Sequence, residues 1–156
     1  EFGYGAGMGM LKLENYKVEN KDHCKEIRTM CGILSDEIIT IGLGAGLDIY
    51  DYDTYLPLYI DMRVKIIRGK VAPVFKANLG YAFNLGSHSG GLMFCPGLNL
   101  KLNFNKDIAL MLGIGLKFQE MYLRQSYNSI SLQNYTSPEK GVVYARFVSI
   151  TAGFQF

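Results

Sequence analysis

The feature of this sequence that most constrains its fold is a two-residue alternation of apolar with small or polar residues, which recurs from Ile38 onward. This period is typical of half-buried strands, and polar turn signals interrupt it at intervals that suit successive strands. The pattern therefore predicts an all-β protein. Six clear strands are expected at residues 39–49, 56–66, 73–83, 92–104, 108–118 and 148–156, and two weaker ones at about 1–13 and 25–34.

The connections between the expected strands alternate between short and long. Residues 35–37, 68–70 and 105–107 form three-residue polar turns, as tight hairpins require. The connections at about 14–24, 50–55, 85–91 and 124–141 are longer. An eight-stranded antiparallel up-and-down β-barrel is therefore expected, with the short turns and both termini at one end and the long loops at the other. That asymmetry is a general feature of outer-membrane barrels.

The two faces of the expected strands differ in charge and in glycine content. In the six clear strands one face is bulky and uncharged, whereas the charged residues and the glycines all lie on the other face. The lumen of a narrow eight-stranded barrel is only just wide enough for side chains, so glycine there makes room for long Lys and Arg chains. The expected lumen charge network comprises Glu26, Arg28, Asp48, Asp61, Arg63, Lys65, Lys76, Lys101 and Lys117.

This assignment makes the apolar face the outer wall of the barrel. A bulky, uncharged wall suits lipid, because a charge at the bilayer midplane costs about 2–4 kcal/mol. The sequence thus predicts a transmembrane β-barrel. Alternation alone does not separate this from a soluble ligand-binding barrel, in which the apolar residues would line an internal cavity.

Composition excludes several other classes. The 156 residues are expected to form one domain, 1–156, and a hydrophobic content of 49% excludes a disordered chain. A net charge of +2, with acidic residues interspersed, argues against a nucleic-acid partner. No apolar run is long enough for a membrane-spanning helix, and the opening residues lack the pattern of an export signal. Three cysteines without C-x-x-C spacing argue against a disulfide framework or a zinc site, so no metal or cofactor is expected.

Four segments, residues 56–63, 72–83, 90–97 and 150–156, carry a resemblance to a known family. They look like strands of the small eight-stranded outer-membrane proteins of Gram-negative bacteria, the OmpA/OmpX-like group with a porin-family outer membrane protein beta-barrel domain. The resemblance implies an outer-membrane location. The closing alternation that ends on Phe154 and Phe156 also implies recognition by the barrel assembly machinery. Activity is not implied, because the family is defined by its architecture.

The lumen charges and one loop are the candidates for chemistry. We expect the lumen charges to form ion pairs that plug the barrel, since unpaired charge in a narrow interior is costly; a gated pore is the alternative. Lipid A-modifying enzymes also exist on such barrels. The local candidates here are Ser87, His88 and Ser89, with Glu120 or Asp53 as a carboxylate. A glycine-flanked loop offers no rigidity for a catalytic geometry, so no catalytic residue is expected and the protein is predicted not to be an enzyme.

The long loops have compositions that suit adaptable contacts with a protein partner. Five basic residues near the outer rim are expected to contact lipopolysaccharide phosphates: Lys12, Lys25, Arg124, Lys140 and Arg146. The expected role is therefore non-enzymatic. It is surface interaction, envelope structure or membership of a larger outer-membrane assembly, with outer-membrane lipid and lipopolysaccharide as partners.

Overall fold

The computed structural model describes residues 1–7, 10–13, 16–19, 23–35, 38–50, 53–67, 69–86, 90–105, 108–123 and 141–156. Within these ranges, no helix is long and apolar enough to cross a membrane. The strands are β1 (Phe2–Gly7), β2 (Met10–Leu13), β3 (Tyr16–Glu19), β4 (His23–Ser35), β5 (Ile39–Tyr50), β6 (Thr54–Lys65), β7 (Val71–Asn84), β8 (Gly90–Asn103), β9 (Ala109–Leu123) and β10 (Gly141–Gln155).

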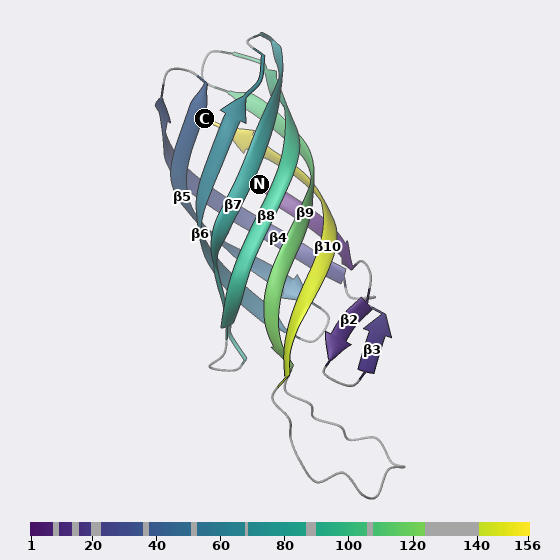
Figure 1. Cartoon of the computed structure of the whole chain (residues 1–156). Coiled ribbons are helices and arrows are strands. Elements are labelled where there is room, and N and C mark those ends of the chain that lie inside the picture. The colour runs from purple at the N-terminus through teal and green to yellow at the C-terminus, as the bar shows by residue number, and fades with distance from the viewer. Residues whose placement is uncertain are drawn as a thin grey trace, which may run out of the picture.

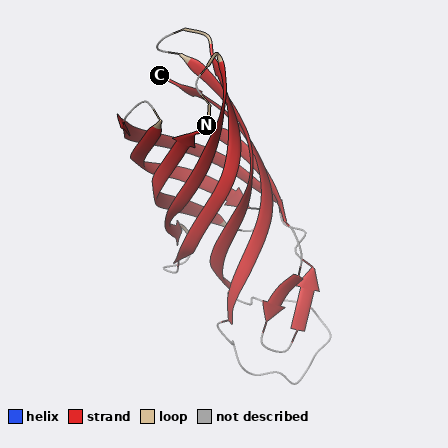
Figure 2. Ribbon diagram, turned by 45° about the horizontal axis from the view of Figure 1, so that its top comes forward, coloured by secondary structure: helices blue, strands red, loops and turns tan. Residues whose placement is uncertain are grey.

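Eight of the described strands close into a barrel in the order β1-β10-β9-β8-β7-β6-β5-β4, and β1 also pairs with β4. All pairings are antiparallel, and apart from the closure at β1 each barrel strand lies beside its neighbours in sequence. The predicted all-β, eight-stranded antiparallel barrel is confirmed. Figures 1 and 2 show strongly tilted strands, with the C-terminus at one end of the barrel and the β2–β3 hairpin beyond the other.

The first expected strand, residues 1–13, is wrong in its extent. β1 ends at Gly7, and Met10–Leu13 instead pairs with Tyr16–Glu19 in a separate two-stranded sheet. The sequence supplies a physical reason, because odd positions of β1 carry the lumen-facing glycines. Continued in register, Leu11 and Leu13 would enter the charged lumen and Lys12 would face the apolar side.

The last two strands extend further toward the long-loop end than their apolar alternation predicted. β9 runs to Leu123 and β10 begins at Gly141, and their pairing is continuous from Gly141↔Leu123 to Gln155↔Ala109. The inward positions there are still filled, because Gln119, Met121, Ala145 and Phe147 are all buried. Only the outward-facing residues depart from the bulky apolar pattern there, so the pairing of β9 with β10 continues beyond the end of that pattern.

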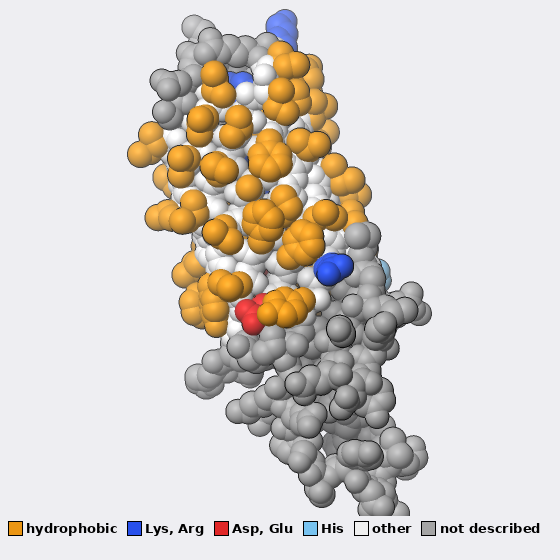
Figure 3. Space-filling model, in the orientation of Figure 1, with side chains coloured by type: hydrophobic (Ala, Val, Ile, Leu, Met, Phe, Trp, Pro, Cys, Tyr) orange, Lys and Arg blue, Asp and Glu red, His pale blue; other side chains and the backbone are white. Residues whose placement is uncertain are grey.

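The barrel has an apolar outer wall and a polar interior. Leu43 is 71% exposed and Ile150 is 65% exposed, whereas Asp48 and Asp61 are fully buried at 0%. Every barrel strand contributes at least one exposed large apolar side chain to the wall. Figure 3 shows apolar side chains spread over one face of the barrel, with charged side chains visible near its ends.

Glycines make room in the lumen for large neighbours, as the sequence predicts. At Gly46 on β5, an added Cβ would lie 2.6 Å from the carbonyl oxygen of Ile27 and 2.9 Å from Cγ of Arg28, so the glycine accommodates both the neighbouring backbone and a long basic chain. At Gly44 the neighbour is aromatic instead, because a Cβ would collide with the ring of Tyr59. Lumen glycine in this barrel therefore makes room for tyrosine as well as for arginine.

The charged lumen as candidate functional site

The deepest group of lumen charges, which we call the Lys117 cluster, consists of Glu26 and Arg28 on β4, Asp48 on β5 and Lys117 on β9. Lys117 Nζ lies 2.6 Å from Asp48 Oδ2 and 3.4 Å from Glu26 Oε1. Arg28 Nη2 lies 3.2 Å from Glu26 Oε2 and 3.4 Å from Asp48 Oδ1. All four residues are at most 5% exposed. Two cations and two carboxylates thus neutralise one another out of contact with solvent.

The Lys117 cluster resolves a repulsion that the sheet creates. Glu26 and Asp48 lie directly opposite each other on the paired strands β4 and β5, where like charges are destabilising. Lys117 comes from β9, which does not pair with either strand, and reaches across the lumen to both carboxylates. The cluster therefore ties opposite walls of the barrel together, and removal of one partner would leave an uncompensated buried charge.

An aromatic layer packs against the Lys117 cluster on the long-loop side. Lys117 Nζ lies 4.9 Å from the ring centroid of Tyr50 and 5.9 Å from that of Phe147, within the range of cation–π attraction. The Tyr50 hydroxyl donates a 2.6 Å hydrogen bond to Oε1 of Gln119. Tyr55 packs edge-on against Tyr50, with ring centroids 5.5 Å apart. These side chains occupy the lumen on the long-loop side of the Lys117 cluster.

Sequence reasoning missed this aromatic layer. Residues 50–55 were expected to be a loop, yet Tyr50 ends β5, and Tyr55 lies in β6 and is only 2% exposed. The signal was present at Phe147, whose odd number places it on the lumen-facing side of β10.

A second group, which we call the Arg63 cluster, consists of Glu1, Asp61 and Arg63, with Lys76 from β7. Arg63 holds Asp61 in a two-pronged contact, with Nε 2.7 Å from Oδ1 and Nη2 3.2 Å from Oδ2. The Glu1 carboxylate accepts from Arg63 Nη2 at 3.2 Å and also from Lys76 Nζ. The Glu1 nitrogen donates a 2.8 Å hydrogen bond to the carbonyl of Arg28, which anchors the start of β1 beside β4. Glu1 was not among the expected lumen charges.

Lys65 and Lys101 do not join either cluster. The seven other residues of the expected network are divided between the two clusters, but these two lysines make no ion pair with any carboxylate in the part of the chain that the structure describes. Both are half-buried and line a cavity at the short-turn end of the barrel.

Three potential metal ligands lie together, two of them in the Lys117 cluster and the third, Cys24, beside it. Cys24, Glu26 and Asp48 are buried and offer ligand atoms within 4.8 Å of one another. Lys117 Nζ lies 3.6 Å from Cys24 Sγ as well as 2.6 Å from Asp48 Oδ2. An ammonium therefore already occupies the position in which a metal cation would be neutralised.

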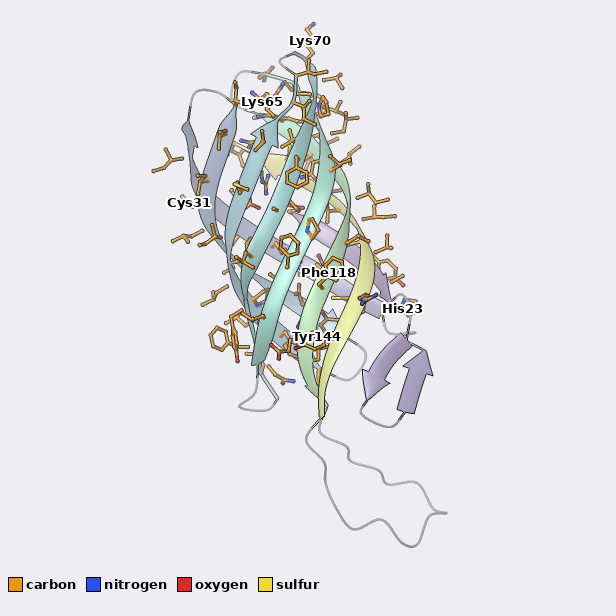
Figure 4. All side chains as sticks on the ribbon, viewed as in Figure 1. His23, Cys31, Lys65, Lys70, Phe118 and Tyr144 are labelled. Atoms are coloured by element: carbon orange, nitrogen blue, oxygen red, sulfur yellow. The ribbon has the colours of Figure 1, made fainter. Side chains whose placement is uncertain are left out.

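The expected lipopolysaccharide-contact residues are described only in part. Lys25 and Arg146 are exposed and lie on the outward-facing side of β4 and β10, near the long-loop end. Close to them, the Tyr4 hydroxyl is 2.7 Å from Nδ1 of His23, and the two rings are stacked. Lys12 lies in β2, whereas Arg124 and Lys140 lie outside the described residues. Figure 4 labels His23, Tyr144 and Phe118 on this part of the barrel.

The candidates for catalysis do not come together as a described group. Ser87, His88 and Ser89 lie outside the described residues. Glu120 Oε2 accepts a 3.3 Å hydrogen bond from the Leu92 backbone N–H, and the Asp53 carbonyl accepts one from Tyr50. At the other end, the expected assembly-signal residues Phe154 and Phe156 point outward and are 62% and 90% exposed.

Comparison of the chain with models of known families, with curated proteins and with solved structures gives no match.

Proposed function

We propose that this chain is a non-enzymatic integral outer-membrane β-barrel protein with a plugged polar lumen. The observation that carries the proposal is the inverted distribution of its residues, with the large apolar side chains outside and the charges inside. A soluble monomer rarely exposes a contiguous apolar patch of more than a few hundred Å². Exposing such a patch to water costs free energy, and contact with lipid removes this cost.

The apolar wall is continuous across neighbouring strands. Phe75, Leu98, Ile114, Ile150 and Tyr4 lie directly opposite one another on β7, β8, β9, β10 and β1, and each is at least 40% exposed. Cross-strand neighbours on one face are about 4.5–5.5 Å apart, so the row has no polar gap. A row of this kind supports burial in hydrocarbon.

Aromatic side chains gather on the outer wall toward the long-loop end. Phe94 stacks on Phe118 with ring centroids 6.4 Å apart, and Tyr81 contacts Phe83 at 4.9 Å. Tyr144 is 68% exposed near the same end. Aromatic girdles at the membrane–water interface are typical of outer-membrane barrels, so these rings support an interface at this height, with the long loops outside the cell.

A soluble ligand-binding barrel is less well supported. It would need an apolar internal cavity, but the described interior carries the Lys117 and Arg63 clusters and their ion pairs. A diffusion pore is disfavoured for the same reason, because ion pairs and the aromatic layer fill the lumen. The role that suits a filled barrel is surface interaction, envelope structure or membership of a larger outer-membrane assembly.

Refolding tests the membrane proposal directly. The chain is refolded from denaturant into detergent micelles, and boiled and unboiled samples are compared by gel electrophoresis beside a detergent-free control. We expect a shift in mobility on boiling and aggregation without detergent. A monodisperse monomer in detergent-free buffer would overturn the proposal and indicate a soluble barrel.

The proposal includes contact between the outer-rim basic residues and lipopolysaccharide phosphates, because Lys25 and Arg146 are outward-facing at the long-loop end. Replacement of Lys12, Lys25, Arg124, Lys140 and Arg146 by Gln is expected to weaken co-purification of lipopolysaccharide with the refolded barrel. Lys70→Gln, in a short turn at the opposite end, is the matched control. Unchanged association in the fivefold variant removes this part of the proposal.

A further inference from the structure

The charges inside the barrel do not balance at every height. Each of the two ion-pair clusters contains two basic side chains and two carboxylates, so the side-chain charges of each cluster balance. Lys65 and Lys101 are left over, and they carry a charge of +2 with no acidic partner among the described residues. Each lies within electrostatic reach of the other. Among the residues that the structure describes, the side-chain charge of the lumen is therefore unbalanced at the height of these two lysines.

The two lysines line a small cavity at the short-turn end, which we call the mouth cavity. Its volume is about 20 Å³, and the polar side chains that line it are Thr40, Arg63, Lys65, Lys101 and Gln155. They come from strands β5, β6, β8 and β10, so the cavity lies within the barrel and not on its wall. Figure 4 labels Lys65 at this end, below the exposed Lys70 of a short turn.

The lining of the mouth cavity is rich in hydrogen-bond donors. Lysine offers three N–H donors and no acceptor, and threonine and glutamine side chains can each donate as well. No acidic side chain of a described residue lines the cavity, and the carboxylates of Asp61 and Glu1 already accept from Arg63, which does line it. Half-buried like charges repel each other more strongly than they would in bulk water, because the local dielectric is lower. An anion between them converts that repulsion into two attractions.

We propose that the mouth cavity binds an oxyanion, either a carboxylate or a phosphate group, between Lys65 and Lys101. A cavity of about 20 Å³ has room for one water-sized group, so one or two oxygens of the anion would enter it while the rest of the molecule stays outside the barrel opening. Charge-assisted hydrogen bonds from two ammonium groups would hold the oxygens, with Thr40 and Gln155 as further donors. The periplasmic position of this end rests on the proposed function, whereas anion binding itself does not.

The test uses the full chain refolded in a non-ionic detergent, or in buffer alone if the chain proves soluble without detergent. Lysine side chains labelled with ¹³C at Cε are followed by NMR while inorganic phosphate, acetate or chloride is added at constant ionic strength. The variants are Lys65→Gln, Lys101→Gln and the double variant. Lys70→Gln is the matched control, because it removes an exposed lysine of a short turn at the same end.

We expect saturable shifts of two lysine signals with phosphate and acetate and none with chloride. Each single variant should bind the anion about three- to tenfold more weakly. This is the loss of affinity expected for a charge contact that is neither fully exposed nor fully buried. The double variant should not saturate, and Lys70→Gln should bind like the unaltered protein. Non-saturating shifts, or an equal loss in Lys70→Gln, would overturn the proposal.

Two further ligands separate the sources of the anion. A short-chain phosphatidic acid carries the phosphate on a lipid, and a peptide with a free C-terminal carboxylate carries the other group on a polypeptide. Saturable binding of one of these two ligands that is tighter than binding of the free ion, and that is lost in the double variant, supports the anion site in the mouth cavity and identifies the source of the anion. Failure of both ligands together with failure of the free ions excludes an anion site.

Discussion

Lysine introduced at two depths of the outer wall gives the sharpest test of what surrounds this barrel. Ile114 lies in the middle of β9 and is 59% exposed, and Ile66 lies beside a short turn and is 58% exposed. The two residues match in type and in exposure but differ in distance from the end of the barrel. Any difference between Ile114→Lys and Ile66→Lys therefore reports the solvent at each height.

The expected magnitudes follow from the cost of charge in lipid. Lysine on the lipid face of a barrel costs about 2–4 kcal/mol at the bilayer midplane and about 0–1 kcal/mol near the interface. Ile114→Lys should therefore lower the folding equilibrium constant roughly 30- to 900-fold, and Ile66→Lys at most about fivefold. In water, both exposed substitutions would change stability by less than about 0.5 kcal/mol.

The assay is denaturant unfolding of the barrel in phospholipid vesicles, with the folded fraction measured by gel mobility or circular dichroism because the chain contains no Trp. The free energy of unfolding is compared for the unaltered chain and both variants. Equal stability of Ile114→Lys and Ile66→Lys would refute a hydrocarbon environment around the middle of the barrel.

Two further predictions concern the interior. Lys117→Met should destabilise the barrel by about 3–5 kcal/mol, because it leaves one buried carboxylate uncompensated. The double variant Lys117→Met with Asp48→Asn should recover most of this lost stability. If the effects of the two substitutions simply add in this double-mutant cycle, the pairing of Lys117 with Asp48 is contradicted. Gly44→Ala should cost about 1–3 kcal/mol because the new methyl group collides with the Tyr59 ring, whereas Gly69→Ala meets its nearest atom only at 3.6 Å and should leave the unfolding midpoint unchanged.

Much of the fold could be predicted from the sequence because a strand's period is short and local. Alternation assigns each side chain to one of two faces, and a closed barrel gives each face one environment along its whole length. That is why the bulky residues from Ile39 onward were correctly assigned to the outside. The prediction was wrong for the first strand, which was expected to extend to Leu13. Beyond Gly7 the alternation would place the apolar side chains of Leu11 and Leu13 in the charged lumen, which does not suit them.

The ion-pair partners could not be predicted, because the period gives a side chain's direction but not its height. Glu26 faces Asp48 only in the register that β4 and β5 adopt, and Lys117 reaches both from the far wall. Lys65 and Lys101 also lie at a different height in the barrel from the lumen carboxylates. The sequence pattern places all these residues on the same face and so does not reveal this separation. Unpaired charge is costly deep in the lumen but cheaper at a mouth that solvent or an anion reaches. Within the described part of the chain, the barrel accordingly balances its side-chain charges where they are buried and leaves Lys65 and Lys101 without a carboxylate partner at its short-turn opening.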